Sequence, residues 1–186
     1  MDNETCGRER RQVHVQTIYG AIEGYVETGE RSRTLDGLNL SSGKFLRIED
    51  AVVSSPVWSF DRGTIGVNAS AILFVIERTR YRRKGDERVE AARFNRAAVR
   101  LCVGKYEIQG FIHVPGRGDI LTRLNRDKYS FIALTSASVV GPDSELAAPF
   151  MAVNRTHITA AQELLDEESE LPAPGEEARA ELCHEA

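Results

Sequence analysis

Two polar residues that could contact a ligand occur twice in this chain at one separation. Arg31 recurs as Arg117 and Asn39 recurs as Asn125, each 86 positions later. Asparagine offers both a donor and an acceptor, and arginine offers five donors in a planar fork. Structural roles compete with this interpretation: asparagine is favoured in turns, and an exposed arginine is ordinarily solvated surface. The repetition adds weight to a shared surface role for the arginines, and both roles stay open for the arginines and the asparagines.

The basic stretch between Arg78 and Arg96 is the second group of candidate ligand-binding residues. It holds eight basic residues against three acids, in a chain whose formal net charge is −4. Its first five basic residues are Arg78, Arg80, Arg82, Arg83 and Lys84. Basic side chains neutralise phosphates, and the interspersed Tyr81 and Phe94 could stack on bases. The alternative partner is the acidic segment 163–186, whose charge is complementary.

The residues that usually carry catalysis do not form a recognisable pattern. His14, His113, His157 and His184 are isolated, with no pair at the spacing of helical metal ligands. The sequence contains no nucleophile elbow, phosphate-binding P-loop or dinucleotide fingerprint. We therefore expect neither an enzyme nor a cofactor.

Composition and cysteine content indicate the compartment. Three widely spaced cysteines without a C-x-x-C pair suit a reducing environment. Residues 1–12 lack the apolar core of a secretory signal, and no apolar run approaches the ~20 residues that span a bilayer. We expect a cytoplasmic protein that does not enter a membrane.

The strongest feature of the sequence is a tandem duplication. Sliding the chain by 86 positions aligns residues 13–53 with 99–139 without a gap, and ten of the 41 pairs are identical. Unrelated segments would match at about two or three positions, given average residue usage. After a loop shortened by nine residues, 73–79 aligns with 150–156. The chain therefore contains two copies of one unit.

Each copy has the pattern of about five short strands. Residues 13–18 alternate in polarity, and 71–77 form an apolar run typical of a strand buried on both faces. Gly24 and Gly110 lie in the middle of strands, where glycine marks a sharp bend or a close backbone approach, including approach to a ligand. Small sheets protect their edges by closing into a barrel or by pairing with a neighbour. The last strand of each copy is the best candidate for pairing between units.

The remaining segments are expected to be irregular or helical. We expect 57–68 to be irregular, 87–97 to end the linker as a short helix, and 160–165 to begin the tail as another. The expected organisation is a flexible N-terminus (1–12), a first barrel (13–79), a basic and partly helical linker (80–98), a second barrel (99–160) and an acidic, disordered tail (161–186).

These motifs resemble those of a known family. An I-x-G-hydrophobic-hydrophobic strand (22–26 and 108–112), an L-N pair (38–39 and 124–125) and a hydrophobic-x-x-A-x-V segment (48–53 and 134–139) look like the first motif of Sm-like (LSm/Hfq-type) barrels. Residues 153–158 are similar to the second motif. Small duplicated bacterial domains of unknown function share this general pattern.

The resemblance implies a fold and a set of site residues. The fold is all-β, with two tandem five-stranded Sm-like or SH3-like barrels. Asn39 and Asn125 match the asparagine that lines the nucleotide pocket of the family. Arg155, and at the end of the first copy Arg78, match the arginine of the second motif. The implied ligand is RNA.

A second resemblance concerns the loop of the first copy. Residues 31–33, followed by 39–43, are similar to the arginine and N-x-S-x-x-G signals of PilZ domains, which bind cyclic dinucleotides. The sequence thus leaves three functions open. They are a non-catalytic adaptor that self-associates or binds a protein partner through edge strands, an RNA or single-stranded nucleic-acid binder, and a cyclic-dinucleotide module.

Overall fold

The computed structural model describes residues 8–29, 34–40, 45–78, 94–115, 119–126, 128–142 and 145–164. The first half contains β1 (Arg8–Thr17), β2 (Ala21–Gly29), α1 (Thr34–Leu40), β3 (Phe45–Ser54), β4 (Gly63–Asn68), η1 (Ala69–Ala71) and β5 (Ile72–Glu77). The second half contains β6 (Phe94–Val103), β7 (Tyr106–Pro115), α2 (Ile120–Arg126), β8 (Phe131–Val140), β9 (Glu145–Asn154), η2 (Arg155–His157) and β10 (Ile158–Glu163). The described chain is therefore mostly β.

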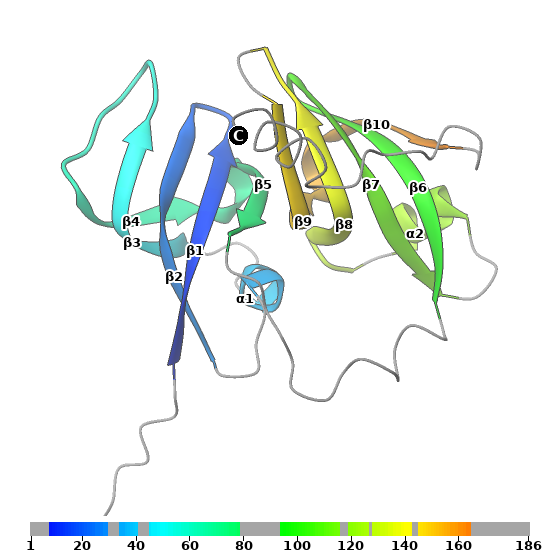
Figure 1. The fold of residues 1–186 in the computed structure, drawn as a ribbon, viewed down its shortest axis with the longest axis horizontal. Coiled ribbons are helices and arrows are strands. Elements are labelled where there is room, and N and C mark those ends of the chain that lie inside the picture. The colour runs from blue at the N-terminus through cyan, green and yellow to red at the C-terminus, as the bar shows by residue number, and fades with distance from the viewer. Residues whose placement is uncertain are drawn as a thin grey trace, which may run out of the picture.

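The ten strands form one open antiparallel sheet in the order β10-β6-β7-β8-β9-β5-β1-β2-β3-β4 (Figure 1). Five strands in each half confirm the expected all-β class. Two separate barrels are not confirmed, because the β5–β9 pair joins the halves into a continuous sheet. No helix in the described ranges is long and apolar enough to cross a membrane.

Most strand pairings of the first half recur in the second half at a separation of 86 residues. Val13 pairs with Glu77 between β1 and β5, and Val99 pairs with Glu163 between β6 and β10. Phe45 pairs with Asn68 between β3 and β4, as Phe131 does with Asn154 between β8 and β9. We call residues 86 positions apart equivalent. The strand pairing thus repeats in the way that a duplication predicts, but the alignment of 73–79 with 150–156 is wrong, because β10 is the equivalent of β5.

Side-chain contacts repeat at the same separation. The guanidinium carbon of Arg10 lies 4.1 Å from the centre of the Tyr25 ring, and that of the equivalent Arg96 lies 4.2 Å from the Phe111 ring. The side chain of Asn68 accepts the amide of Ser70 at the start of η1, as Asn154 accepts the amide of Thr156 at η2. These turns are shaped by asparagines that the sequence alignment had not paired.

Gly24 and Gly110 mark the expected bend. The β2–β3 register shifts between Glu23 and Tyr25, and the β7–β8 register shifts at the equivalent place. A Cβ atom on Gly24 would lie 2.5 Å from Ile48 Cγ2 and 2.8 Å from the Glu49 carbonyl oxygen. Opposite the bend, Asp50 has a φ of +48°. The close approach of β3 accounts for the glycine, as the structural interpretation predicts.

The N-terminal strand begins earlier than expected. Residues 8–12 belong to β1, although 1–12 were expected to be flexible. Arg11 is 1% exposed, and its Nη1 lies 2.5 Å from Glu77 Oε1. The other carboxylate oxygen of Glu77 accepts the hydroxyl of Thr34 at 2.8 Å. This buried ion pair holds the start of β1, the end of β5 and the start of α1 together, which composition alone does not reveal.

Several other element assignments need correction. Phe94–Ala97, expected in a helix, lie in β6 and pair with β7; residues 79–93 lie outside the described part. Gly63–Asn68, expected to be irregular, form β4. Residues 160–163, expected to begin a helix, end β10, which continues past the expected domain boundary at 160. The leucine–asparagine pairs, for which no helix was expected, lie in α1 and α2. Tertiary pairing overrides local composition at these places.

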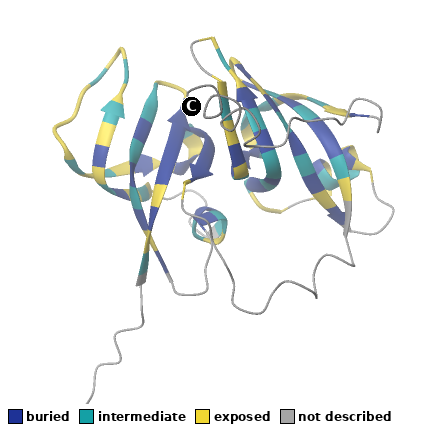
Figure 2. Cartoon of the chain, in the orientation of Figure 1, coloured by how far each residue is buried: buried dark blue, intermediate teal, exposed yellow. Residues whose placement is uncertain are grey.

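The core consists of two clusters that exchange residues across β5. All six residues of β5 are buried, which confirms the strand predicted at 71–77 (Figure 2). Leu73, Phe74 and Ile76 pack into the core of the second half, whereas Ile72 and Val75 pack into that of the first. In return, Phe131 and Ala152 of the second half lie in the first core. β5 therefore belongs to both halves.

A series of glycine substitutions tests the bend. We expect Gly24→Ala to lower the free energy of unfolding by about 1–3 kcal/mol, because the methyl group meets backbone and a buried isoleucine. Gly110→Ala should cost less, since its nearest contact is the Leu134 methyl at 3.1 Å. Gly37→Ala in α1 has open space and should stabilise by up to ~1 kcal/mol. Urea denaturation measures all three, and equal effects at Gly24 and Gly37 would refute the account.

Candidate functional site

The junction is the contact between the two halves, centred on the β5–β9 ladder. Phe74 pairs with Val153, Val75 with Ala152 and Ile76 with Met151. The Phe74 ring meets the Tyr106 ring edge-on at 5.3 Å between centroids, which extends the contact to β7. The expected pairing of a terminal apolar strand across units is thus confirmed for the first half.

Asn39 forms the polar part of the junction. Its Nδ2 donates to the carbonyl oxygen of Phe131 at 3.0 Å, and its Oδ1 accepts the Phe131 amide at 2.9 Å. The carboxamide thereby satisfies both backbone groups of the first residue of β8, as a neighbouring strand would. α1 is thus attached to the opposite half of the chain.

A second asparagine, which belongs to the second half, bonds to the backbone of the first half. Nδ2 of Asn154, a buried side chain, donates to the carbonyl oxygens of Ile72 at 2.9 Å and Ala69 at 3.3 Å. His157 Nε2 lies 2.6 Å from the carbonyl oxygen of Ser70. These bonds fix η1 of the first half against the end of β9 and the turn that follows it.

The junction is directional. A two-fold arrangement would pair Asn125 with Phe45 in the way that Asn39 pairs with Phe131. Instead Asn125 is exposed and bonds no described residue, and Phe45 is 67% exposed where Phe131 is 2% exposed. The first half presents α1 and β5 to the second half, and the second half presents β8 and β9. Among the described residues, each half therefore has one such surface inside the junction, and the other, which we call its free surface, lies outside it.

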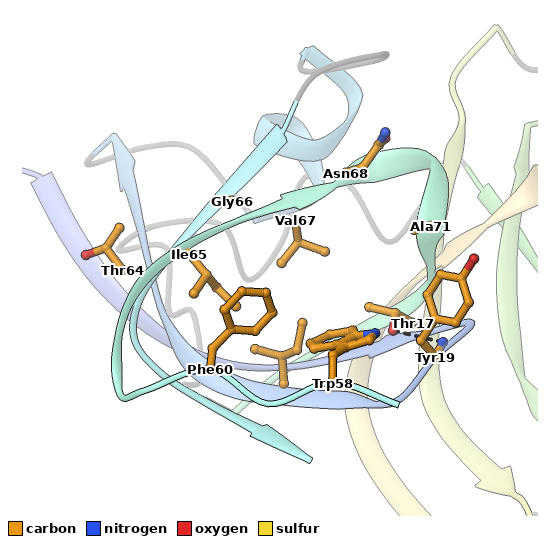
Figure 3. Close-up of a pocket in the computed structure, with 11 residues that line it drawn as sticks. Thr17, Tyr19, Trp58, Phe60, Thr64, Ile65, Gly66, Val67, Asn68 and Ala71 are labelled. Atoms are coloured by element: carbon orange, nitrogen blue, oxygen red, sulfur yellow. Dashed lines mark hydrogen bonds between the residues drawn. The ribbon is translucent and has the colours of Figure 1, made fainter. Parts of the chain in front are cut away.

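The free surface of the first half contains an apolar pocket of about 630 Å³ (Figure 3). We call it the acceptor pocket. The rings of Trp58 and Phe60 lie opposite Ile65 and Val67 of β4. Its remaining lining residues are Thr17, Tyr19, Ile22, Thr64, Gly66, Asn68 and Ala71. β4 is an end strand of the sheet, so its outer side has no described neighbour.

The free surface of the second half contains a smaller pocket of about 260 Å³ between α2 and β10. We call it the donor pocket. Its lining residues are Leu121, Leu124, Asn125, Arg155, Ile158, Thr159, Ala160 and Ala161. Asp119 precedes α2 and accepts both the amide and the hydroxyl of Thr122 at 2.7 Å, and these bonds hold the pKa of Asp119 below its ordinary value. β10 is the other end strand of the sheet.

The predicted ligand-binding residues fall into three groups. Some lie outside the described residues, some are engaged in bonds within the chain, and two line the donor pocket. Arg31, Arg117, Arg82, Arg83 and Lys84 lie outside the described residues, as do Arg80 and most of the PilZ-like motif.

Asn39 is engaged with Phe131, and Arg78 Nη2 lies 3.5 Å from Glu23 Oε1. Asn125 and Arg155 are brought together in the donor pocket. Arg155 also donates to the carbonyl oxygens of Leu124 and Tyr129 at 2.7 and 3.3 Å, so it holds the end of α2.

The three described histidines, His14, His113 and His157, lie on separate elements, β1, β7 and η2. His14 Nδ1 lies 2.6 Å from Glu23 Oε1, and its ring stacks near Phe74. No group of three histidine, cysteine or acidic side chains among the described residues could hold a metal ion. Cys102 is a free cysteine.

Most residues of the two free surfaces carry no local sequence signal for a binding site. Phe45, Trp58 and Phe60 were not singled out, nor was Asn68 recognised as the equivalent of Asn154. The signal that identifies them is the separation of 86, which continues through Pro56/Pro142, Val67/Val153, Asn68/Asn154, Ile72/Ile158 and Glu77/Glu163. Introducing a gap in the alignment concealed it.

Comparisons with known proteins assign no family. No protein-family model, curated protein or solved structure matches this chain. The function must therefore be argued from the geometry of the junction and its two free surfaces.

The equivalent asparagines provide a test of the junction. We expect Asn39→Ala to lower the free energy of unfolding by about 1–3 kcal/mol, because the Phe131 amide and carbonyl lose their partners. Asn125→Ala should change it by less than about 0.5 kcal/mol at low protein concentration, since its side chain is exposed. Denaturation of both variants measures the difference. Similar effects at the two positions would contradict the assignment.

Proposed function

We propose that the protein is a non-catalytic assembly module that binds other polypeptides by strand addition at its sheet ends. The observation that supports this best is the directional junction, which occupies one surface of each half and leaves the complementary surface free. Exposed sheet edges are pairing sites that proteins usually block. Added strands gain affinity from main-chain hydrogen bonds and specificity from side-chain pockets.

We further propose that each half is a small Sm-like or SH3-like barrel. The support is the strand order β5-β1-β2-β3-β4, which recurs as β10-β6-β7-β8-β9, together with the bulge opposite Gly24 and Gly110. A bulged, strongly bent sheet of five strands is the geometry from which small barrels are built.

The orientation of backbone groups supports strand addition at β4. Alternate residues of an antiparallel strand direct their N–H and C=O groups to opposite sides. Phe131 gives both groups to Asn39, on the side of β8 away from β9. Phe131 and its β9 partner Asn154 are therefore a pair without mutual hydrogen bonds. Two residues along β8, Ala133 and its partner Ala152 form a pair of the same kind. Ala152 consequently directs its N–H and C=O groups to β5. By equivalence, Gly66 directs its N–H and C=O to the open side of β4.

A peptide titration tests strand addition. We expect a synthetic peptide of residues 70–79, with added lysines for solubility, to bind the acceptor pocket, because β5 pairs with β9 and β4 is the equivalent of β9. Trp58 is the only tryptophan in the chain and lines this pocket, so its emission should shift to the blue on binding.

Two substitutions at one position control the titration. Gly66→Pro removes the outward N–H and should abolish the shift. Gly66→Ala keeps that N–H, and its Cβ would have only an ordinary 3.5 Å contact with Phe45, so binding should persist. No shift with wild-type protein, or equal binding by both variants, would refute strand addition at β4.

A second candidate function is RNA binding. The observation in its favour is that the donor pocket brings together Asn125 and Arg155, the two residues that the Sm-like resemblance assigns to a nucleotide pocket. The Asn125 carboxamide is exposed there and bonds no described residue.

Filter binding measures this candidate. If RNA is the ligand, wild-type protein should retain single-stranded RNA at low salt and lose it steeply as salt rises. Asn125→Ala should weaken retention while Asn39→Ala, whose carboxamide is engaged with Phe131, should affect it less. The absence of retention at low salt would remove the RNA hypothesis.

A further inference from the structure

We propose that the partner at both ends is a second copy of this chain, with β10 of one chain docked against β4 of the next. This inference rests on the proposed strand addition and names its occupant. The internal repeat provides the argument: each free pocket is the equivalent of a space that is filled at the junction.

The acceptor pocket is the equivalent of the space that β5 fills in the second half. The residues equivalent to Thr17, Ile22, Ile65 and Val67 are Val103, Ile108, Met151 and Val153. Those four belong to the core cluster that contains Leu73, Phe74 and Ile76 of β5. In the first half the same surface is open. The strand that belongs there by equivalence is β10.

The donor pocket is the equivalent of the surface that receives Phe131. The residues equivalent to Leu124, Arg155, Ile158 and Ala161 are Leu38, Ala69, Ile72 and Val75. All four lie in one cluster with the buried Phe131. The residue equivalent to Phe131 is the exposed Phe45, so Phe45 of the second copy fits the donor pocket. Asn125 is then placed to bond the backbone of Phe45 as Asn39 bonds that of Phe131.

The register follows directly from the junction. The pairs Phe74–Val153, Val75–Ala152 and Ile76–Met151 become Ala160–Val67, Ala161–Gly66 and Gln162–Ile65 between chains. Asn68 Nδ2, which bonds no described residue, gains the carbonyl oxygens of Arg155 and Ile158, as Asn154 has those of Ala69 and Ile72.

The strand that would enter the acceptor pocket is smaller than β5. β10 carries Thr159 and Ala160 where β5 carries Leu73 and Phe74. The rings of Trp58 and Phe60 line the pocket that would receive it.

Light scattering across a concentration series tests this proposal. Wild-type mass should rise with concentration up to the solubility limit, with a parallel blue shift of Trp58 emission. Phe45→Ala should raise the dissociation constant about tenfold or more, because it deletes a ring that the interface buries. Val52→Ala, which removes another exposed apolar side chain away from both pockets, should leave it unchanged. A wild-type chain that stays monomeric at the solubility limit would overturn the proposal.

Mixing two blocked variants tests the direction of assembly. Gly66→Pro blocks the acceptor end, and Ala161→Pro blocks the donor end, where Ala161 is equivalent to Val75. Each variant alone should be monomeric, and an equimolar mixture should give a heterodimer of two chains. Asn125→Ala serves as a milder donor-end variant should Ala161→Pro disturb β10. Self-association without rescue in the mixture would indicate a two-fold dimer and refute head-to-tail docking.

The two proposals fail in distinguishable ways. If the 70–79 peptide shifts Trp58 emission but wild-type protein remains monomeric, strand addition stands and the second copy is not its occupant. If the peptide does not bind, strand addition itself fails. RNA bound through Asn125, without any change in mass that depends on protein concentration, would assign the donor pocket to RNA and overturn self-assembly.

Discussion

The structure depends on β5 being shared between two cores. Its alternate side chains pack into the first and second halves, and its backbone pairs with β1 on one side and β9 on the other. An apolar side chain fully buried in this way contributes about 1.5–3 kcal/mol. The strand therefore fixes the relative position of the two halves. The hydrogen bonds of Asn39 and Asn154 also fix which surface of each half is in contact, because apolar burial has no preferred direction.

A directional contact has a geometric consequence for the ends. In a two-fold contact both partners use the same surface, so nothing remains free. Here each half has a donor surface and an acceptor surface, and the junction uses one of each. Among the described residues, the two units therefore leave one donor surface and one acceptor surface outside the junction. Repeating the junction between chains closes into a ring if the rotation permits it, and otherwise extends as a filament.

The sequence predicts the features that depend on local pattern or repetition. The duplication, the buried strand at 71–77 and the bends at Gly24 and Gly110 are all visible in it. It does not predict α1 and α2, because seven residues are too few for helical periodicity to be recognised. It misses β4 and β10 because two glycines in the first and the polar residues in the second weaken the strand pattern. The bond from Asn39 to a backbone 92 positions away has no local signal at all.

The difference between β5 and β10 bears on folding and on the proposed assembly. If β10 were as apolar as β5, each chain would expose a second strand of Leu, Phe and Ile during folding, which is an aggregation hazard. Thr159, Ala160 and Gln162 make the donor end tolerant of water. The large aromatic residues Trp58 and Phe60 line the acceptor pocket instead. The junction within the chain is therefore the stronger contact and forms first, because its strands are covalently linked. The proposed contact between chains would then be the weaker of the two and would depend on protein concentration.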